Sequence, residues 1–352
     1  MTRDLDAMIH EPAAWLAAAG EDSEIVMSSR VRIARNLSGH RFTHHCDNEE
    51  LSAILRESRD AAREAGAFAR NRFIPMGQIS TLDRQFLAER HLVSREFLIN
   101  SANRGLMVNT NEDVCLMINE EDHLRLQGFA AGFNLESAFQ RANGLDDDLS
   151  VLELAHSDRF GYLTACPTNL GTGMRVSVLI HLPGMVHSKE INKLLESLRK
   201  LNHSIRGLYG EGSEVMGNFF QLSNSATLGT PEEEIVSGLR EMVTKVIGFE
   251  RRAREMLFRK ARTLLEDKVW RAYGLLRYAR SVNTKEALSL ISAVRLGVGT
   301  GMIDDVSIRS LNRLLIYTQP AHLQKLNGTT MDAQERDVAR ADYIRRVLCS
   351  SQ

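Results

Sequence analysis

Short apolar runs separated by polar turns dominate the first two-thirds of the chain. The clearest pair lies at 106–109 and 114–118, and the polar stretch Thr110–Asp113 between them is typical of a tight turn. Short connections favour antiparallel neighbours because parallel strands need long crossovers. Further candidate strands lie at 161–166 and 175–182, joined by the loop 167–173, and at 219–222.

Stretches with apolar residues three and four apart alternate with these strands. The segments 48–65, 127–143 and 188–202 have this spacing, which is typical of amphipathic helices. Strands with short connections and interspersed helices indicate an α+β fold. We therefore expect an antiparallel sheet flanked by helices in this part of the chain.

The pattern changes to continuous helix after Thr230. Thr230 is a suitable helix cap, Pro231 suits the first helical position, and three glutamates follow in the first turn. From there to about Ser281 the spacing remains helical, with one weak point near Gly248. The sequence therefore predicts one long helix that begins a new structural unit.

The rest of the chain also has helical spacing. Two further helices are expected at 285–296 and 306–314. We place a boundary near Phe249, where the mixed pattern has given way to helix. The prediction is a mixed domain at 1–249 followed by an all-helical domain at 250–352.

The overall composition is ordinary for a soluble globular protein. The 352 residues carry a formal net charge of −1, with 43% hydrophobic and 25% charged residues. A charge this close to zero argues against a general nucleic-acid binder, which needs a basic surplus. No apolar run approaches the roughly 20 residues of a membrane helix, and the acidic N-terminal segment lacks the order of a secretory signal. We expect a cytoplasmic protein with no direct nucleic-acid or membrane contact.

The four cysteines do not form a metal-binding pattern. They are widely scattered and include no pair with two residues between them, so no structural zinc site is expected. In a reducing cytoplasm they are expected to be free thiols. The cysteines are Cys46, Cys115, Cys166 and Cys349.

Arginines and carboxylates gather at the ends of the predicted strands. Neither of the two commonest nucleotide-binding loops is present. Ser28–Arg32 instead places two arginines at i and i+2, where an extended segment puts them on one face. Taken singly, such a pair is usually a solvated face, an acidic turn is usually only a turn, and a lone histidine at 91 or 123 is usually structural. The other clusters are Asn119–Arg125, Arg175 after a glycine-rich loop, and Arg206–Glu211.

Taken together and in this order, the clusters resemble the phosphagen kinase superfamily, which includes arginine kinases, creatine kinases and their bacterial relatives. The resemblance implies an ATP- and Mg²⁺-dependent kinase that phosphorylates a guanidinium group. The matching segments are SSRVR (28–32), NEEDHLR (119–125), CPTNLGTGMR (166–175) and RGLYGE (206–211).

The resemblance also implies a role for each matching residue. Five arginines of the family hold the ATP phosphates and the transferred phosphoryl group, and a histidine lines the nucleotide site. Two family carboxylates and a cysteine lie at the acceptor; they fall on Glu121, Glu211 and Cys166. The implied ATP-binding residues are Ser28, Ser29, Arg30, Val31, Arg32, His91, Arg125, Arg175, Val176, Ser177, Val178, Leu179, Arg206, Gly207, Leu208, Tyr209, Gly210 and Glu211.

Elementary chemistry agrees with these roles. Phosphoryl transfer needs alignment and neutralisation of the phosphate oxygens more than covalent help. Planar, always-charged guanidinium groups each grip phosphate through two donors. The acceptor guanidinium is protonated in water and a poor nucleophile, so carboxylates that orient it and accept a proton would promote attack. A nearby thiolate would stabilise the acceptor cation further.

Two features favour arginine in proteins as the acceptor. Phosphagen kinases carry a helical domain before their SSRVR-like segment, whereas 27 residues precede Ser28 here, so an open site is expected. The segment Arg336–Ala341 also matches the RDxxRA motif of the McsB family of bacterial protein arginine kinases. Alone, this segment could be an exposed helix with charge pairs. In the family it forms an allosteric phosphoarginine pocket, which falls on Arg336, Asp337 and Arg340.

The resemblance to the McsB family implies partners as well. They are protein substrates with exposed arginine, a Clp ATPase and protease that receives the marked proteins, an activator protein, and a second copy of the chain in a homodimer. Two alternatives stay open from the residues themselves. One is a kinase of free arginine or another small guanidine, and the other is a catalytically weak regulator that binds phosphoarginine.

Overall fold

Eight strands form the main sheet of the computed structural model, which describes residues 2–20, 22–68, 71–99, 101–207 and 216–349. The strand order is β2-β3-β4-β5-β1-β8-β10-β9, and neighbouring strands are antiparallel throughout, as predicted. Two short strands form a separate sheet. The strands are β1 (Val26–Arg35), β2 (Asn71–Pro75), β3 (Gly105–Asn109), β4 (Val114–Ile118), β5 (Leu124–Ala131), β6 (His156–Ser157), β7 (Gly161–Tyr162), β8 (Met174–His181), β9 (His203–Gly207) and β10 (Phe219–Asn224).

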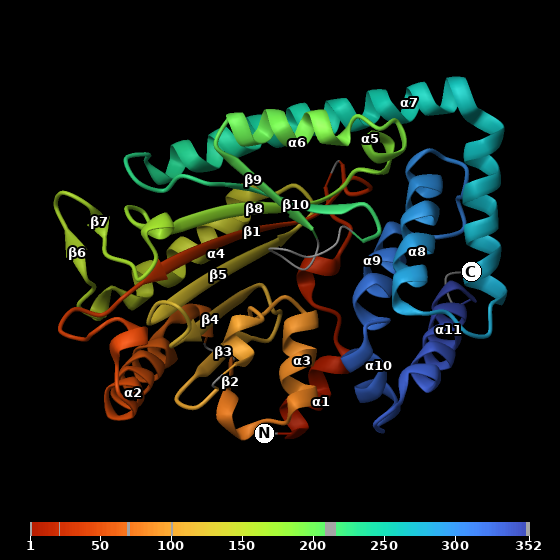
Figure 1. The fold of residues 1–352 in the computed structure, drawn as a ribbon. Coiled ribbons are helices and arrows are strands. Elements are labelled where there is room, and N and C mark those ends of the chain that lie inside the picture. Colours follow the sequence, from red (N-terminus) through yellow and green to blue (C-terminus); the bar gives the residue numbers. More distant parts are fainter. Residues whose placement is uncertain (1, 21, 69–70, 100, 208–215, 350–352) are drawn as a thin grey trace.

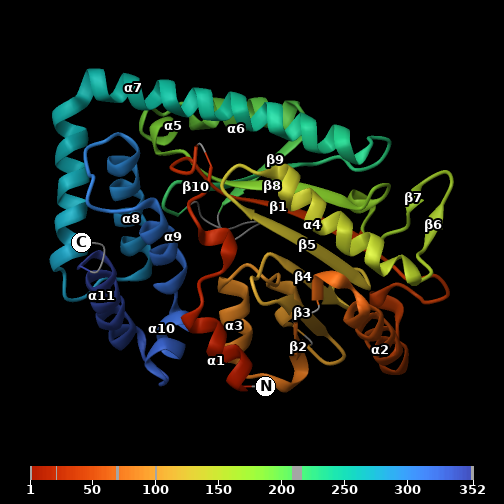
Figure 2. The ribbon, with the colours of Figure 1, turned by 180° about the vertical axis from the view of Figure 1, so that it is seen from behind.

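Helices cover the sheet and continue from one end of it as an all-helical part (Figures 1 and 2). α4 packs on β1 and β5, and α7 packs on β8 and β10 before it turns away toward the C-terminal helices. In the described ranges, no helix has both the length and the apolar character needed to cross a membrane. The helices are α1 (Thr2–His10), α2 (Asn48–Glu64), α3 (Thr81–Glu89), α4 (Leu135–Asp148), α5 (Pro183–His187), α6 (Ile191–Lys200), α7 (Glu232–Tyr278), α8 (Thr284–Gly299), α9 (Ile308–Tyr317), α10 (Pro320–Asn327) and α11 (Ala333–Cys349), with 3-10 turns η1 (Ala14–Leu16), η2 (Thr43–His45), η3 (Gly66–Phe68), η4 (Met76–Gln78), η5 (Glu96–Leu98), η6 (Leu149–Val151) and η7 (Pro167–Asn169).

Each face of the sheet belongs to a different hydrophobic core. Val31 and Ile33 of β1 pack with α2, α4 and the first part of α7 on one face. On the other face, Phe129 of β5 and Leu179 of β8 join a core that continues through α1, α3 and the C-terminal helices. The strand period of two explains this division, because alternate side chains point to opposite faces. One end of the second face therefore packs toward the all-helical part of the chain.

α7 connects the two parts of the molecule. It begins at Glu232 with Pro231 as its N-cap, one residue later than predicted, and it remains helical at Gly248. The weak point predicted near Gly248 is therefore wrong, because the backbone leaves helical geometry at Ala261 instead (φ −142°, ψ 37°). Figure 1 shows that α7 turns along its length. The division into 1–249 and 250–352 stays a prediction, because the helix runs through that boundary.

Two of the predicted elements need correction. The segment 127–143 is not one helix, since 124–131 forms β5 and α4 begins only at Leu135. The segments 161–166 and 175–182 do not pair with each other: β7 pairs with β6, and β8 lies between β1 and β10. By contrast, the predicted hairpin of β3 and β4 and the helix from Asn48 are confirmed.

The end of α3 is attached to the all-helical part by buried polar contacts. The Glu89 carboxylate accepts hydrogen bonds from the N–H groups of Ala321 and His322 at the start of α10, at 2.8 and 3.0 Å. Burial raises the pKa of Glu89 to about 8. The next residue, Arg90, forms a buried ion pair with Glu112 on two oxygens, at 2.6 and 2.7 Å. This end of α3 is therefore fixed from both sides.

Candidate active site

Four of the predicted phosphate-binding arginines lie on one face at the centre of the main sheet. Arg30 and Arg32 share a face of β1 because residues two apart point the same way. Arg175 on β8 is the direct partner of Arg32, and directly opposed residues share a face. Arg125 on β5 belongs to the same face, since it lies two residues from Gln127, the partner of Arg32 on that strand. The fold thus brings four guanidinium groups together on the side away from α4, the arginine face.

The fifth arginine, Arg206, lies on the edge strand β9 and on the arginine face as well. Gln221 on β10 is paired with both Arg206 and Leu179, and Leu179 shares its face of β8 with Arg175. Gly207 is the last residue of β9. The predicted site residues that follow it lie outside the described residues: Leu208, Tyr209, Gly210 and Glu211.

The other predicted nucleotide-site residues of β1 and β8 divide between the two faces of the sheet. The hydroxyl of Ser29 donates a hydrogen bond to the carbonyl of Gly132 (2.9 Å) and accepts one from the N–H of Asn134 (3.0 Å). Residues on that side could reach a ligand on the arginine face only through their backbone. The arginine face carries Ser28, Ser177 and Leu179, and the opposite face carries Ser29, Val31, Val176 and Val178.

The central arginines are short of negative charge. Burial, and after it the charge of Arg125, lowers the pKa of Arg30 to about 10. Burial and the neighbouring guanidinium groups also lower the pKa of Arg32 well below its ordinary value. No acid in the described ranges forms an ion pair with Arg30 or Arg32, whereas Arg35 at the end of the same strand pairs with Asp146 at 2.6 Å. Such a cluster is suited to binding a polyanion.

The acidic turn after β4 holds a buried and an exposed glutamate. Glu120 accepts a hydrogen bond from Ser94 (2.6 Å) and forms an ion pair with Arg125 (2.6 Å). Burial alone would raise the pKa of Glu120, but Arg125 and Ser94 outweigh it, so this pKa lies below its usual range. The Glu121 side chain is 43% exposed, and its carboxylate lies 3.7 Å from Arg125. The Glu120 carboxylate is therefore engaged in contacts within the protein, whereas Glu121 faces solvent.

Cys166 lies close enough to Glu121 for its thiol to lower the pKa of that carboxyl group. The Cys166 sulfur is also 3.0 Å from the hydroxyl of Thr168, and the side-chain amide of Asn169 donates to Glu121 at 3.5 Å. Partial burial, followed by the neighbouring acids, raises the pKa of Glu121, while Arg125 and Cys166 oppose the shift. Two of the three predicted acceptor residues are thus brought together at the edge of the arginine cluster.

Asp122 connects the acidic turn to the loop that carries Cys166. Its buried carboxylate accepts a hydrogen bond from the side-chain amide of Asn36 and another from the N–H of Ala165, both at 2.7 Å. Ala165 directly precedes Cys166, so the same oxygen links the acidic turn to the cysteine loop. The position of the thiol against Glu121 therefore depends on Asp122.

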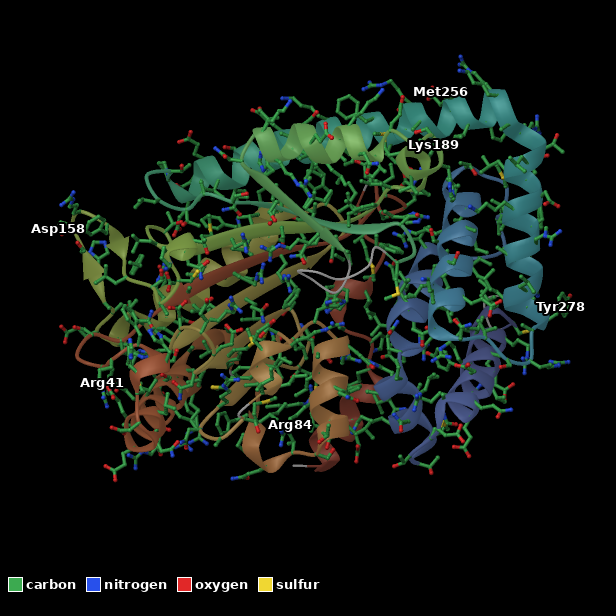
Figure 3. All side chains as sticks on the ribbon, in the orientation of Figure 1. Arg41, Arg84, Asp158, Lys189, Met256 and Tyr278 are labelled. Carbon is green, nitrogen blue, oxygen red and sulfur yellow. The ribbon has the colours of Figure 1, made fainter. Side chains whose placement is uncertain are left out.

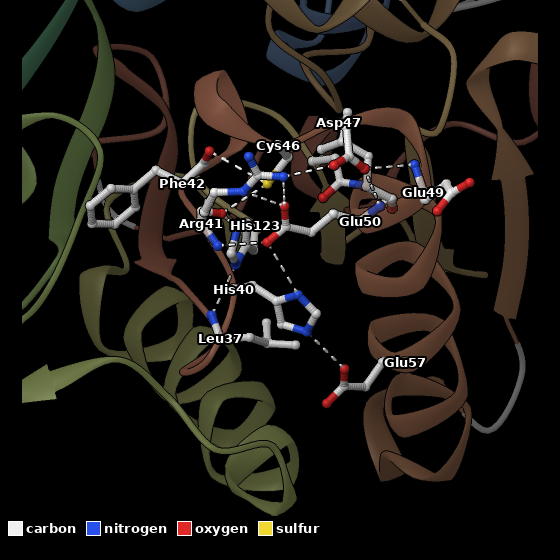
Figure 4. A network of polar contacts seen from close by, with 12 residues as sticks. Leu37, His40, Arg41, Phe42, Cys46, Asp47, Glu49, Glu50, Glu57 and His123 are labelled. Atoms are coloured by element: carbon white, nitrogen blue, oxygen red, sulfur yellow. Dashed lines mark hydrogen bonds and ion pairs between the residues drawn. The ribbon is translucent and has the colours of Figure 1, made fainter.

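His123 fastens the turn to the loop that follows β1, as Figure 4 shows. Its Nδ1 accepts the N–H of Leu37 (3.0 Å), so its Nε2 carries the proton and donates to the carbonyl of Arg41 (2.8 Å). Burial lowers the pKa of His123, in agreement with a neutral ring. Arg41 in turn pairs with Glu50 at the start of α2, and Thr43 donates to the acidic turn itself. His123 is structural.

A small cavity of about 30 Å³ opens at the Ser28 end of the arginine face. His91 lines it from just beyond α3, with its backbone in the left-handed region (φ 58°). Burial, and then the charge of Arg30, lowers the pKa of His91 to about 3, so the imidazole is neutral. The aromatic rings of Trp15 and Phe129 also line it, together with Arg30, Ser177, Leu179 and Gln221.

Several residues of the site were not identified from the sequence. Glu120 and Asp122 lie inside the matched acidic segment, and their burial behind Glu121 could not be read from it. Asn36 lies beyond the end of β1 and carries no motif. Trp15 and Phe129 were missed because a single aromatic residue in a short turn or strand has no periodic signal.

The C-terminal motif lies on α11, and its three predicted ligand-binding residues differ in exposure. Arg340 is buried and donates to the carbonyls of Thr318 (2.9 Å) and Val282 (2.7 Å). Asp337 pairs with Arg340 at 2.5 Å, and it and Arg336 are partly exposed. A hollow of about 870 Å³ on α11 is lined by other residues. Arg340 therefore holds the motif in place, and the other two side chains reach the surface.

Comparisons with known proteins agree over nearly the whole chain. Residues 54–253 match the family model of the ATP:guanido phosphotransferase C-terminal catalytic domain, and residues 262–352 match that of the protein-arginine kinase McsB C-terminal domain. A protein-arginine kinase of Desulforamulus reducens is 41% identical, with 96% of this chain and 95% of that protein covered. The protein-arginine kinase of Geobacillus kaustophilus is 42% identical, with 96% and 93% covered.

Solved structures of guanidino kinases have the same catalytic fold. A duplicated taurocyamine kinase of Schistosoma mansoni is 27% identical with a TM-score of 0.62, and the match covers 69% of this chain and 35% of that one. A lombricine kinase is 26% identical with a TM-score of 0.57, covering 71% and 77%. With the relatives of equal length, these matches lead to one conclusion: the chain belongs to the protein-arginine kinase family, in which a guanidino kinase catalytic domain precedes a helical C-terminal domain.

Proposed function

We propose that this chain transfers the γ-phosphoryl group of ATP to arginine side chains of proteins. The observation that carries the proposal is the arginine face, which ends beside Glu121 and Cys166. The positive charge that would bind a polyphosphate thus lies next to a carboxylate that would bind a guanidinium group. The relatives that bear the name protein-arginine kinase support the choice of acceptor.

The arginine face fits the triphosphate of ATP. Arg30 and Arg32 have lowered pKa values and lack acid partners among the described residues, so phosphate oxygens would supply the missing charge. The described ranges contain no group of three His, Cys, Asp or Glu side chains placed to hold a metal. The Mg²⁺ ion would then be held by phosphate oxygens and water, where it neutralises developing charge.

Glu121 is suited to orient the acceptor guanidinium and to take its proton. Its partial burial raises its pKa, which makes the carboxylate a stronger base at neutral pH than an exposed one. Its position 3.7 Å from Arg125 supports an acceptor site at the edge of the proposed phosphate site. Cys166 would lie against the same guanidinium, and Glu211 is proposed as the second carboxylate.

Two other functions are tested by the same experiment. One is a kinase of free arginine or a small guanidine, and the other is a weak kinase that mainly binds phosphoarginine. The protein with ATP and Mg²⁺ should give acid-labile phosphate on arginines of a disordered, arginine-rich protein, detected by mass spectrometry without acid. Turnover on free L-arginine and none on protein would favour the first alternative. Phosphoarginine binding without ATP turnover would favour the second.

Single substitutions test the assigned roles. Glu121→Ala should abolish transfer while leaving ATP affinity close to that of the wild type, and Glu121→Gln separates the loss of charge from the loss of bulk. Arg206→Ala should lower activity roughly a thousandfold, as expected for a transition-state arginine. Arg206→Lys keeps the charge without the two-donor grip and should recover only part of it. Full activity of Glu121→Ala would reject the acceptor site.

The surface of α7 supports a homodimer. Leu264, Trp270, Leu275 and Tyr278 are exposed on its second half, and Tyr278 is seen at the surface in Figure 3. Leu264, Leu275 and Tyr278 share one face of the helix by their spacing, and we propose that this face meets a second copy of the chain. Leu264→Glu with Tyr278→Glu should convert a dimer to a monomer in light scattering. Val151→Glu, at an exposed apolar residue elsewhere, is the matched control.

The remaining partners follow from the family resemblance. We propose a cytoplasmic enzyme whose products go to a Clp ATPase and protease, with an activator protein and with feedback through phosphoarginine at Arg336 and Asp337. A reconstituted Clp protease should degrade a substrate only after this kinase and ATP have modified it. Equal degradation of the unmodified substrate would reject the link to proteolysis.

A further inference from the structure

The arginine face ends in an aromatic pocket rather than in open solvent. Ser28 lies four residues before Arg32 on β1, which is ~13 Å along the strand. Between these points the character of the face changes from guanidinium groups to the rings of Phe129 and His91 and the side chain of Leu179. An extended nucleotide with its phosphates on the arginines would therefore place its base among these groups.

Trp15 forms one wall of this pocket. Its ring is stacked on Phe129 with the centroids 6.2 Å apart and meets His91 edge-on at 5.7 Å. The indole is 2% exposed, and its N–H group has no hydrogen-bond partner in the described part of the chain. A buried N–H without a partner is rare in folded proteins. It is explained if a ligand atom supplies the acceptor.

The segment that carries Trp15 is held firmly at both sides. Ala14 donates its N–H to the carbonyl of Asn111 (3.0 Å), and the side chain of Asn312 on α9 donates to the carbonyl of Leu16 (3.1 Å). Because the backbone of η1 is fixed in this way, a movement at this position would be a rotation of the indole itself. In a third contact, the Arg90 side chain donates a hydrogen bond to the carbonyl of Glu11 (2.9 Å), which anchors the chain just before η1.

The size of the cavity requires such a movement. A volume of about 30 Å³ holds about one water molecule, not a purine. We infer that Trp15 is a base-recognition residue: the purine of ATP enters between the sheet and the indole, which rotates to stack on it. The inference rests on the proposed nucleotide site and adds to it a residue from outside the motifs that define that site.

Trp15 can be observed directly, because the chain has only two tryptophans. Trp270→Phe removes the other one, which lies on α7 with 50% of its surface exposed. In this variant, ADP and AMP should change the emission of Trp15 and its quenching by acrylamide. Inorganic tripolyphosphate, which has charge and no base, should bind and leave both unchanged.

Affinities provide the second measurement. Trp15→Ala should weaken ADP binding roughly 5- to 150-fold, the range for loss of one base–aromatic stack, and leave tripolyphosphate affinity within about twofold. Trp15→Phe should lie between, because it keeps a ring and loses the N–H donor. Calorimetry gives both affinities without turnover.

The outcomes separate this inference from the proposed function. If neither ADP nor tripolyphosphate binds to the Trp270→Phe protein, the nucleotide site itself is rejected. If both bind, but ADP leaves Trp15 emission unchanged and Trp15→Phe binds ADP like the wild type, only the role of Trp15 is overturned. The emission test uses the protein that retains Trp15, so the role of Trp15 can be judged even if Trp15→Ala does not fold.

Discussion

Replacement of Arg30 should make the ligand-free protein more stable and the enzyme inactive. Its pKa is about 10 against an ordinary 12.5, so the folded state disfavours the charged guanidinium that the unfolded chain tolerates. A difference of this size corresponds to ~3 kcal/mol of destabilisation at neutral pH. The group is only half-buried, and solvent screening reduces this to ~1–3 kcal/mol. Arg30→Met removes the charge and keeps an apolar stem.

One favourable contact is lost in the same variant. The Arg30 guanidinium lies 5.8 Å from the centre of the Phe129 ring, an interaction worth about 0.5–1 kcal/mol at a partly exposed site. The net expectation for Arg30→Met is a gain of ~1–2 kcal/mol in the free energy of unfolding without ligand. Activity should fall roughly a thousandfold. The stabilisation that ATP gives the wild type should also shrink, because it follows the affinity.

Arg35→Met is the matched control on the same strand. Arg35 is 1% exposed, pairs with Asp146 at 2.6 Å, and donates to the carbonyl of Thr172 at 2.8 Å. Its removal leaves a buried carboxylate unpaired and should cost ~3–5 kcal/mol. Urea unfolding followed by circular dichroism, with and without ATP, measures both variants. An Arg30→Met protein less stable than the wild type without ligand would refute this account of the arginine face.

Three further predictions concern groups around the site. Asp122→Ala loses two hydrogen bonds to a buried carboxylate, at ~1.5–3 kcal/mol each. It should therefore raise KM for the protein acceptor more than KM for ATP, and Asp122→Asn, which keeps the accepting oxygen, should have a smaller effect. Equal effects on both KM values would contradict the assigned role. In the folded state Glu89 keeps a proton that the unfolded chain releases near pH 4.5. The free energy of unfolding of the wild type, relative to that of Glu89→Gln, should therefore fall between that pH and about pH 8 in urea titrations. A constant difference between the two proteins would show that the carboxyl group titrates normally. Arg336→Ala should weaken activation by phosphoarginine and spare basal activity, whereas Arg340→Ala should lower the melting temperature because its buried contacts are lost; a normally activated Arg336→Ala enzyme would remove the pocket.

Local patterns predicted the elements that have one apolar face and a clear turn. The hairpin of β3 and β4 was predicted because Thr110–Asp113 interrupts two apolar runs, and α2 because apolar residues recur at helical spacing. β5 was mistaken for helix because Gly128, Ala130 and Ala131 are small and give no strand alternation. Tertiary pairing with β1 and β4 decided that segment, and no local signal reports it.

The position of the bend in α7 could not be predicted either. Gly248 is the weakest helix former in that region, yet it sits in regular helix. The departure is at Ala261, although alanine is the residue type with the highest helix propensity. α7 packs on the sheet and also on the C-terminal helices, so it has to turn between them. Packing between distant parts overrides propensity at both positions.

The arginines of the site could be predicted, but not what supports them. Arg30 and Arg32 follow from strand spacing, and the family resemblance supplied the others. The burial of Glu120 and the two-way contact of Asp122 depend on how the acidic turn meets the cysteine loop. The role of Arg340 in binding phosphoarginine stays a prediction, and its contacts with the carbonyls of Thr318 and Val282 could not be read from the motif.

The end of α3 has a consequence for how sequences of this kind can diverge. Glu89 caps the start of α10, Arg90 neutralises Glu112, and His91 lines the cavity, so three consecutive residues serve the C-terminal helices, the sheet and the ligand pocket in turn. A substitution of Glu89 should therefore affect both His322, which it contacts, and His91, two residues further along the chain. A hybrid enzyme that joins the catalytic half of one bacterial relative to the C-terminal half of another should therefore retain activity only when positions 89 and 322 come from the same parent.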